Sequence, residues 1–182
     1  MTDDPPDKSD QELLSAYARG DRSALGIVYQ RHKHFCYRIA ARHAKDDSRA
    51  MDLVQDAFIY LVQNAGKITL RSKLTTLLYP VILNAARSRF RKDKLLVFGD
   101  QPETPDTDPP IRPASEMEPA LLSAVQGLQP DFQEVLLMRI VDEMSVDEVA
   151  QALSIPAGTV KSRLHTALSQ LRDNPQISHL LD

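Results

Sequence analysis

The chain has 182 residues, of which 42% are hydrophobic and 26% charged, a balance typical of globular proteins with buried cores. It carries a formal net charge of -3 and one cysteine, Cys36, and no run of apolar residues reaches the ~18 that a membrane span needs. These features exclude an intramolecular disulfide and membrane insertion. Because the acidic, polar N-terminus also lacks an apolar signal core, we expect a soluble, cytoplasmic protein.

The net charge conceals a segregation of charge along the chain. Residues 10–93 carry 15 Lys and Arg against 8 Asp and Glu, whereas residues 120–182 carry four basic and eight acidic residues. Binding to a polyanion follows the local field of one face rather than the net charge. The basic N-terminal half is therefore compatible with nucleic-acid binding.

Apolar residues at helical spacing predict four helices in the N-terminal half. The expected helices cover residues 11–19, 23–44, 50–63 and 75–92, with a loop at 64–73. Inward-facing stripes are expected in the second and third: Leu25, Val28, Tyr29, His32, Phe35, Cys36, Ile39 and Ala40, and Leu53, Val54, Ala57, Phe58, Leu61 and Val62. Pro80 is expected near the first turns of the fourth helix, where proline costs least.

Residues 95–119 interrupt the helical pattern. This segment holds six of the twelve prolines and carries one Arg against six acids, which predicts an extended, semi-rigid linker. The fold class is therefore all-α, with two small helical domains joined by a Pro-rich acidic linker. The expected boundaries are a disordered N-terminus at 1–9, domains at 10–94 and 120–174, and a C-terminal tail at 175–182.

The C-terminal domain predicts a helix-turn-helix. "PALLSAVQGL" (119–128) and "PDFQEVLLMRIVD" (130–142) are amphipathic helices, and Ser145 and Glu148 form a capping box that starts the next helix. A last helix follows Pro156, with Ile155 filling the angle between the two. Its apolar face is expected to comprise Val160, Leu164, Ala167, Leu168 and Leu171.

The opposite face of that last helix is rich in hydrogen-bond donors and nearly free of acids. It carries Thr159, Lys161, Ser162, Arg163, His165, Thr166 and Gln170. A helix of this width fits the major groove of DNA, where its N-terminal residues reach the base edges first. A polar face alone is common to all amphipathic helices, but the complete helix-turn-helix pattern favours DNA contact.

The stretch from Leu128 to Arg172 resembles region 4 of bacterial RNA polymerase sigma factors of the sigma-70 superfamily, in the extracytoplasmic-function (ECF) class. The parts of this stretch that are most specific to the family are "GTVKSRL" and the pattern of Ser, Glu, Ala, Leu and Ile that precedes it. In the N-terminal half, "AMDLVQDAFIYLV" (50–62) resembles region 2.2 of that family. "LLYPVILNAARSRFRK" (77–92) resembles regions 2.3–2.4, with Asn84 at the position of the characteristic Asn.

The resemblance implies a sigma factor without catalytic chemistry or cofactor, which binds core RNA polymerase and initiates transcription. Its partners would be double-stranded promoter DNA, the melted single strand of the -10 element and an anti-sigma factor. The implied polymerase-binding residues are Asp52, Leu53, Gln55 and Asp56. Contacts to the -10 element would come from Lys67, Arg71, Lys73, Asn84, Arg87, Arg91 and Lys92, and contacts to the -35 element from Thr159, Lys161, Ser162, Arg163, His165 and Thr166.

Residue spacing supports two of these assignments independently. Asp52 and Asp56 are four apart on one helix face, where a carboxylate pair is able to meet Arg on a partner helix. Asn84, Arg87, Arg91 and Lys94 form one stripe suited to phosphates and a base edge, and Arg89 and Lys92 are expected to thicken that basic patch.

The sequence departs from the family pattern at several positions. Leu77 stands where Trp is usual, and "YPV" (79–81) replaces the more common Tyr-Arg-Ile. Ser154 replaces the turn glycine of region 4. Pro156 replaces the usual Ser or Thr cap, and proline cannot cap a helix through its side chain. The missing Trp removes aromatic support from the expected -10 pocket.

His32, His34 and Cys36 suggest a metal site at first sight. On a helix only His32 and Cys36 share a face, and no Cys or His pair has zinc-finger spacing, so packing is the favoured interpretation and no metal is expected. Cys36 would act as a redox sensor only if it were exposed and of low pKa. Neither a nucleophile–base constellation nor a Gly-rich phosphate loop suggests an enzyme.

Two alternative functions remain open at this point. A free-standing helix-turn-helix regulator would bind DNA tightly without polymerase. A protein-only adaptor would not bind DNA with or without polymerase.

Overall fold

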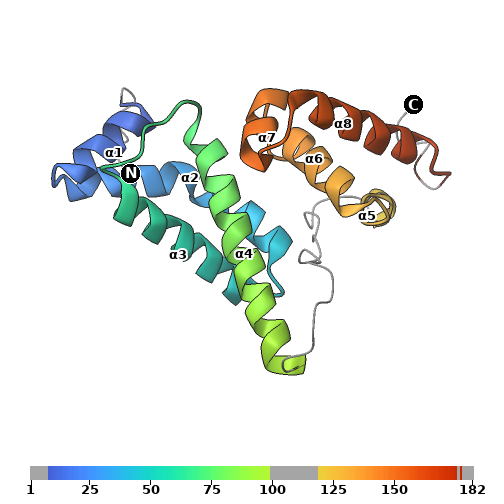
Figure 1. Cartoon of the computed structure of the whole chain (residues 1–182), viewed down its shortest axis with the longest axis horizontal. Coiled ribbons are helices and arrows are strands. Elements are labelled where there is room, and N and C mark those ends of the chain that lie inside the picture. The colour runs from blue at the N-terminus through green and yellow to red at the C-terminus, as the bar shows by residue number, and fades with distance from the viewer. Residues whose placement is uncertain (1–7, 99–118, 176, 178–182) are drawn as a thin grey trace.

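Eight helices follow one another in residues 8–98, 119–175 and 177, which a computed structural model describes, and no strand occurs in these residues (Figure 1). The N-terminal helix group consists of α1 (Asp10–Ala18), α2 (Arg22–His43), α3 (Asp47–Asn64) and α4 (Leu74–Phe98). The C-terminal helix group consists of α5 (Pro119–Gln126), α6 (Pro130–Ile140), α7 (Val146–Leu153) and α8 (Ala157–Arg172). The all-α expectation is confirmed.

Polar side chains set the helix starts. The Asp46 side chain accepts a hydrogen bond from the Arg49 N–H, so α3 begins at Asp47 and not at Ala50 as predicted. The expected capping box of Ser145 and Glu148 is present at the start of α7. Pro156 stands at the N-cap of α8 without a side-chain cap bond, as its chemistry requires.

The ends of the helix groups differ from the predicted boundaries. Ser9, the last residue of the predicted disordered N-terminus, caps α1. Ile177, in the predicted C-terminal tail, is buried beside α8. Helix α4 continues to Phe98, so the first four residues of the predicted linker are helical. Residues 99–118, which hold the rest of that linker, lie outside the described part of the chain, as do residues 1–7, 176 and 178–182.

The core of the N-terminal group follows the predicted stripes with two exceptions. Val28, Phe35 and Cys36 are buried as expected. Tyr29 is exposed and meets the Phe58 ring edge-on, with ring centroids 4.8 Å apart, and Val62 is exposed on α3. Helix α2 packs against α1, α3 and α4, which explains why its stripe is wide.

The two helix groups share one hydrophobic core. Its members from the C-terminal group are Val135, Met138, Met144, Val149, Ala152 and Val160. A second, smaller core lies inside the C-terminal group and includes Ala167 and Leu171 of α8, whereas Leu168, predicted to be buried, is exposed. Helices α4 and α7 pack side by side, so the groups are in contact although only residues 99–118 connect them (Figure 1).

Pro80 lies inside α4 at its seventh residue, within the first two turns of the helix, as expected. Because proline has no N–H, the Thr76 carbonyl cannot receive its usual helical hydrogen bond there. The neighbouring Tyr79 is completely buried and its hydroxyl donates to the Glu134 carboxylate of α6. The departure from the family pattern at these positions therefore lies where the two helix groups meet.

Two residues other than glycine adopt the left-handed backbone conformation in the described chain: Glu143 and Ser154, both with φ 55°. Ser154 is the residue that replaces the turn glycine, and it ends α7 so that α8 turns back against it. A side chain in this conformation costs about 1 kcal/mol.

Ser154→Gly is expected to raise the free energy of unfolding by about 0.5–1 kcal/mol, because glycine removes the steric cost of the left-handed turn. Urea unfolding followed by circular dichroism measures the change. The matched variant Ser154→Val should lower stability, and a Gly variant less stable than the natural chain would contradict this account of the turn.

Candidate functional site

Asp52 and Asp56 lie on the outer face of α3, half-exposed, and Arg89 of α4 binds both. Arg89 Nη1 donates to Asp52 Oδ2 at 3.0 Å, and its Nη2 and Nε donate to Asp56 Oδ2 at 2.6 and 3.1 Å. Hydrogen bonding to Asp56 in particular raises the pKa of Arg89 above its ordinary value. Arg89 thus belongs to the acidic face of α3, and the expectation that it thickens the basic patch of α4 is wrong.

The other two residues of the predicted polymerase surface differ in position. Gln55 is exposed between the two carboxylates, whereas Leu53 lies in the core with 2% of its surface exposed, so it supports α3 from inside. Met51 and Ile59 flank Gln55 at intervals of four residues and are also exposed. This apolar pair beside the carboxylates was missed in the sequence, although exposed apolar residues at helical spacing are a sign of a binding surface.

The loop before α4 carries three of the predicted -10 contacts, Lys67, Arg71 and Lys73, all exposed. The loop borders a cavity of about 370 Å³ between α3 and the start of α4, whose lining includes Tyr60 and Asn64. Gln151 of α7 closes one side of this cavity. Lys73 Nζ forms an ion pair with Glu148 Oε1 of α7 at 3.1 Å.

That ion pair contributes to the ionisation of Glu148. Burial raises its pKa, but hydrogen bonds from the Ser145 backbone and from Lys73 outweigh burial and hold the pKa below its ordinary value. Glu148 is therefore ionised at neutral pH and attracts Lys73 toward α7. One predicted DNA contact thus has an acidic partner from the other helix group.

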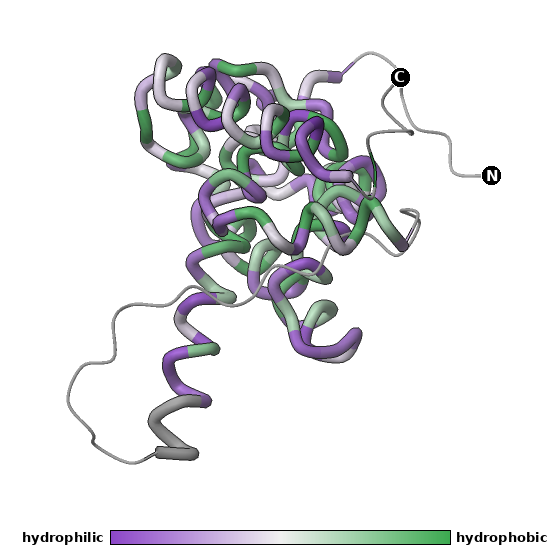
Figure 2. Tube along the Cα trace, turned by 90° about the vertical axis from the view of Figure 1, so that its right-hand side faces the viewer, coloured by the Kyte–Doolittle hydropathy of each residue, from purple (hydrophilic) through white to green (hydrophobic). Residues whose placement is uncertain are grey.

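The basic stripe of α4 divides into two parts. Asn84 and Arg87 face a cleft toward the C-terminal helix group. Arg91 and Lys92 are exposed further along, where α4 projects from the rest of the chain and is mostly hydrophilic (Figures 1 and 2). The side chain of Lys94 lies outside the described residues.

The predicted -35 surface occupies the outer face of α8. Lys161, Ser162 and His165 are exposed, and Thr159, Arg163 and Thr166 are half-buried. The Ser162 and Thr166 hydroxyls each donate to a backbone carbonyl of the preceding turn at 3.0 Å, which leaves their lone pairs free to accept. Because Pro156 makes no side-chain cap bond, the first N–H groups of α8 are available to a phosphate.

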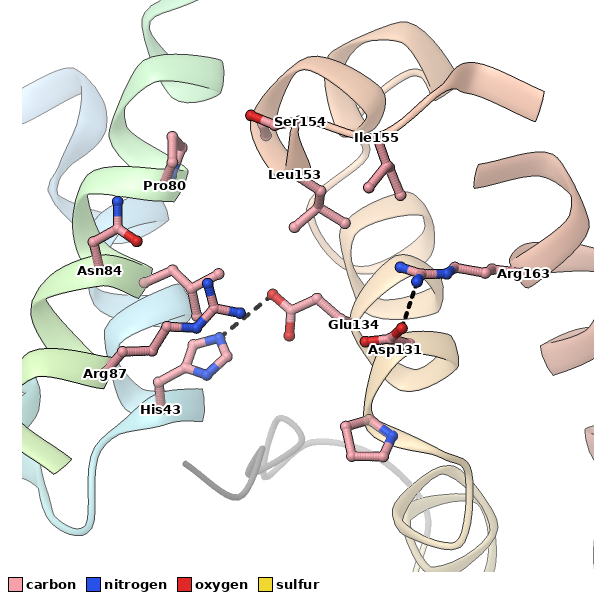
Figure 3. A pocket seen from close by; sticks show the side chains of 13 residues that line it. His43, Pro80, Asn84, Arg87, Asp131, Glu134, Leu153, Ser154, Ile155 and Arg163 are labelled. Atoms are coloured by element: carbon pink, nitrogen blue, oxygen red, sulfur yellow. Dashed lines mark ion pairs between the residues drawn. The ribbon is translucent and has the colours of Figure 1, made fainter. Parts of the chain in front are cut away.

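A cleft of about 410 Å³ separates the two predicted DNA surfaces (Figure 3). Asn84, Arg87 and His43 line it from α4 and α2, and Asp131, Glu134 and Arg163 line it from the C-terminal group. Arg163 is ion-paired with Asp131, and His43 Nε2 lies 3.6 Å from Glu134 Oε1. The structure therefore brings residues from both predicted DNA surfaces to opposite walls of one cleft.

His32 and Cys36, which at first suggested a metal site, have structural roles instead. His32 Nε2 lies 2.8 Å from Asp10 Oδ2, and Asp10 also pairs with Arg31. Burial raises the pKa of Asp10, but His32 and Arg31 outweigh it and lower the pKa. Cys36 is completely buried, and burial raises the pKa of its thiol to about 12, opposite to the low pKa of a redox sensor.

The described residues hold neither a cluster of metal ligands nor a membrane-spanning helix. No three His, Cys, Asp or Glu side chains in residues 8–98, 119–175 and 177 come together as a metal site would require. None of the helices in the same ranges is long and apolar enough to cross a membrane.

Two family models match the chain. The model of sigma-70 region 2 matches residues 28–95, and the model of sigma-70 region 4 matches residues 119–171. The matched residues together make up more than half of the chain, and they contain every residue of the three predicted surfaces.

Curated relatives match over most of the chain. The RNA polymerase sigma-H factor of Pseudomonas aeruginosa is 26% identical, with 88% of this chain and 90% of that protein covered. The ECF RNA polymerase sigma factor SigM of Mycobacterium tuberculosis is 27% identical, with 91% and 84% covered. The ECF sigma factor SigW of Bacillus subtilis is 27% identical, with 89% and 94% covered.

Two solved structures share the fold. CnrH in complex with the cytosolic domain of CnrY superimposes with a TM-score of 0.65 at 21% identity and covers 96% of this chain and 98% of that chain. The sigma factor RpoE of Bartonella quintana, in complex with the anti-sigma factor NepR, gives 0.62 at 21% identity, with 80% and 92% covered.

Cys36 is expected to react with a disulfide reagent at pH 8 at least about a hundredfold more slowly in the folded chain than in guanidinium chloride, because labelling requires local opening of the core. Absorbance of the released thiolate measures both rates. Comparable rates in the two conditions would show that Cys36 is accessible and would restore the redox-sensor hypothesis.

Proposed function

Because the chain belongs to the sigma-70 family of bacterial RNA polymerase sigma factors, in the ECF class, we propose that it binds core RNA polymerase and directs it to promoters with -10 and -35 elements. The observation that carries this proposal is the order of the two matched regions together with their surfaces. An acidic face on α3 precedes basic surfaces on α4 and α8. Initiation at a specific set of genes follows from promoter recognition.

The α3 surface is proposed as the polymerase contact. Asp52 and Asp56 already bind one guanidinium, that of Arg89, so their geometry suits a second Arg on a partner helix. Gln55 lies between them, and the exposed Met51 and Ile59 extend the contact with apolar area. Specific interfaces combine an apolar centre with polar and charged contacts at the rim, and this surface offers both.

The loop at residues 65–73 and α4 are proposed as the -10 contact. The cavity bordered by Lys67 and Tyr60 suits a base taken out of the stack, and Asn84 suits a base edge. Arg87, Arg91 and Lys92 would bind phosphates, which fixes register without reading sequence. Tyr60 supplies an aromatic ring in a chain that lacks Trp.

Helix α8 is proposed as the -35 contact. Lys161, Arg163 and His165 supply donors, and the hydroxyls of Ser162 and Thr166 supply acceptors at its exposed face. The C-terminal half carries few basic residues, so its hold on DNA alone is expected to be weak. Tethering by polymerase raises its effective concentration at the promoter and compensates for this weakness.

We infer a non-catalytic subunit with two domains, residues 10–98 and 119–174, that works in the cytoplasm with its polymerase. The two structural neighbours were solved in complex with CnrY and with the anti-sigma factor NepR, which supports an anti-sigma partner for this chain as well.

The double variant Asp52→Asn/Asp56→Asn is expected to weaken binding to core RNA polymerase at least about tenfold, because two charge-assisted contacts are lost. Pull-down and fluorescence anisotropy with purified bacterial core enzyme measure the affinity. The matched control Asp147→Asn/Asp173→Asn removes two exposed acids elsewhere and should bind normally. Equal affinities of the two double variants would refute the assigned role of α3.

Arg163→Ala is expected to reduce transcription from a cognate promoter about tenfold and to leave polymerase affinity unchanged, because one direct contact to a base or phosphate is worth about 1–3 kcal/mol. Arg172→Ala, at the exposed end of the same helix, serves as control. Run-off transcription with promoters carrying or lacking the -35 element measures the effect. A loss of activity that is equal on both promoters would contradict a -35 role.

A further inference from the structure

A further cavity, here called the three-helix cavity, lies where α2, α3 and α4 meet. Its walls come from the end of α2, the first half of α3 and the second half of α4, so every lining residue belongs to the N-terminal helix group. Its volume is about 370 Å³. Cavities of roughly 300–1,000 Å³ commonly hold small-molecule ligands, so the three-helix cavity is large enough for one.

Positive charge dominates the polar part of this lining. Two carboxylates, those of Asp52 and Asp93, stand against four cationic side chains, which leaves an excess of two positive charges. The four cations come from three segments of the chain: Lys45, Arg49, Arg89 and Lys92. The charge of the cavity therefore favours an anionic ligand.

Two of these cations already converge on one anionic oxygen. Lys45 Nζ lies 3.2 Å from Asp93 Oδ2, and Arg49 Nη1 pairs with the same oxygen. Hydrogen bonds from Arg49 and then from Lys45 hold the pKa of Asp93 below its ordinary value, so its carboxylate is ionised at neutral pH. The two side chains thus have the geometry to bind an oxyanion.

The same ion pairs are open to exchange. The Lys45 side chain is 58% exposed and that of Arg49 is 43% exposed, so water reaches both contacts to Asp93. Exposed ion pairs contribute little to stability. A ligand oxygen is therefore able to replace the Asp93 carboxylate at small cost to the fold.

The buried part of the lining is apolar but contains one histidine. Leu53 and Ala86 are buried there, and Phe90 contributes an aromatic ring. The His43 side chain is 2% exposed, and its Nε2 lies 3.6 Å from Glu134 Oε1, too far for a hydrogen bond. Neither ring nitrogen has a hydrogen-bond partner in the described residues. A ligand with an apolar body and a hydrogen-bonding group suits this wall.

A phosphate monoester fits both parts of the lining. It carries a charge of about -1.5 to -2 at neutral pH and three strong acceptor oxygens, which matches the excess of two positive charges. Its organic group would occupy the apolar part beside Phe90. A phosphodiester carries about one negative charge per phosphate, so it leaves part of the excess uncompensated.

We propose that the three-helix cavity is a binding site for a small phosphate monoester of about the size of a nucleoside monophosphate. The phosphate replaces Asp93 as the partner of Lys45 and Arg49, and the organic group packs against Phe90 and Leu53. Asp52 and Arg89 belong both to this cavity and to the α3 surface, so the ligand lies beside the proposed polymerase contact. That neighbourhood rests on the proposed function, whereas the site itself does not.

Calorimetric titration of the full chain at low salt and pH 7.5 tests the site with three probes: adenosine monophosphate, inorganic phosphate and adenosine. Adenosine monophosphate is expected to bind once per chain with a dissociation constant below about 1 mM. Inorganic phosphate should bind more weakly, and adenosine at least about tenfold more weakly, because it lacks the charged group. Equal binding of adenosine and its monophosphate, or no binding of either phosphate at about 10 mM, overturns the proposal.

Two substitutions are expected to change the affinity in opposite directions. Arg49→Gln should weaken binding of adenosine monophosphate at least about tenfold, because a charge-assisted hydrogen bond is lost. Asp93→Asn should strengthen it about threefold, because a competing negative charge is removed. General damage to the fold would weaken binding in both variants, so the opposite signs identify a direct role.

Matched controls remove the same charges elsewhere. Arg22→Gln at the start of α2 and Asp147→Asn on α7 are exposed and should leave the affinity unchanged. Circular dichroism verifies folding, and if Arg49→Gln unfolds, the more exposed Lys45→Gln tests the same phosphate contact. Affinities of the folded Arg49 and Asp93 variants equal to those of their controls overturn the proposal.

The DNA backbone is a second source of phosphate, and a separate titration distinguishes it from a small ligand. The affinity of each Arg variant for a DNA duplex is measured at low salt without polymerase. Arg49→Gln and Arg22→Gln are expected to bind the duplex equally. Weaker duplex binding by Arg49→Gln together with unchanged binding of adenosine monophosphate would assign these cations to DNA and overturn the small-ligand site.

Discussion

The buried pair of Arg42 and Asp142 is the constraint on which the arrangement of this molecule depends. It joins residues 100 positions apart and holds the turn at residues 141–145, between α6 and α7, against α2. Helix α7 packs against α4, and a cleft lies between the two proposed promoter-binding surfaces. A buried ion pair adds little net stability but strongly disfavours any arrangement that separates one charge from the other. The pair thus specifies how the groups dock more than how firmly the chain folds.

Helix α4 connects the proposed polymerase surface with the proposed -10 surface. One side of it carries Asn84 and Arg87 toward the cleft, and the other side carries Arg89 to the carboxylates of α3. A single rigid element therefore positions the proposed polymerase surface and the proposed -10 surface relative to each other. Arg49 and Lys45 pair with Asp93 near the end of α4, which also keeps α3 and α4 in register. Small movements of α4 would be transmitted to both surfaces.

Local chemistry allowed much of this fold to be predicted from the sequence. Helical spacing predicted the eight helices of the described residues within about three residues of their ends, except that α4 continues six residues further. The capping box of Ser145 and Glu148 was visible as a pattern. The predictions failed where contacts with residues distant in the sequence determine the partners of a side chain. Arg89 is the kind of residue that commonly contacts DNA, and it lies in a basic stretch of the sequence. Only the packing of α3 on α4 reveals its acidic partners. No periodicity predicts that Asp142 meets α2, because that contact joins two halves separated by a linker. The roles assigned to the three surfaces remain predictions drawn from the family.

The most direct measurement of the central claim is transcription of whole genomic DNA by purified bacterial core RNA polymerase, with and without this chain, with every transcript start mapped. If the chain directs polymerase to promoters, some start sites will appear only when the chain is present. These sites will share two short upstream sequence elements at the spacing of -10 and -35 elements. Start sites identical to those of the core enzyme alone would contradict the claim that this chain directs polymerase to promoters.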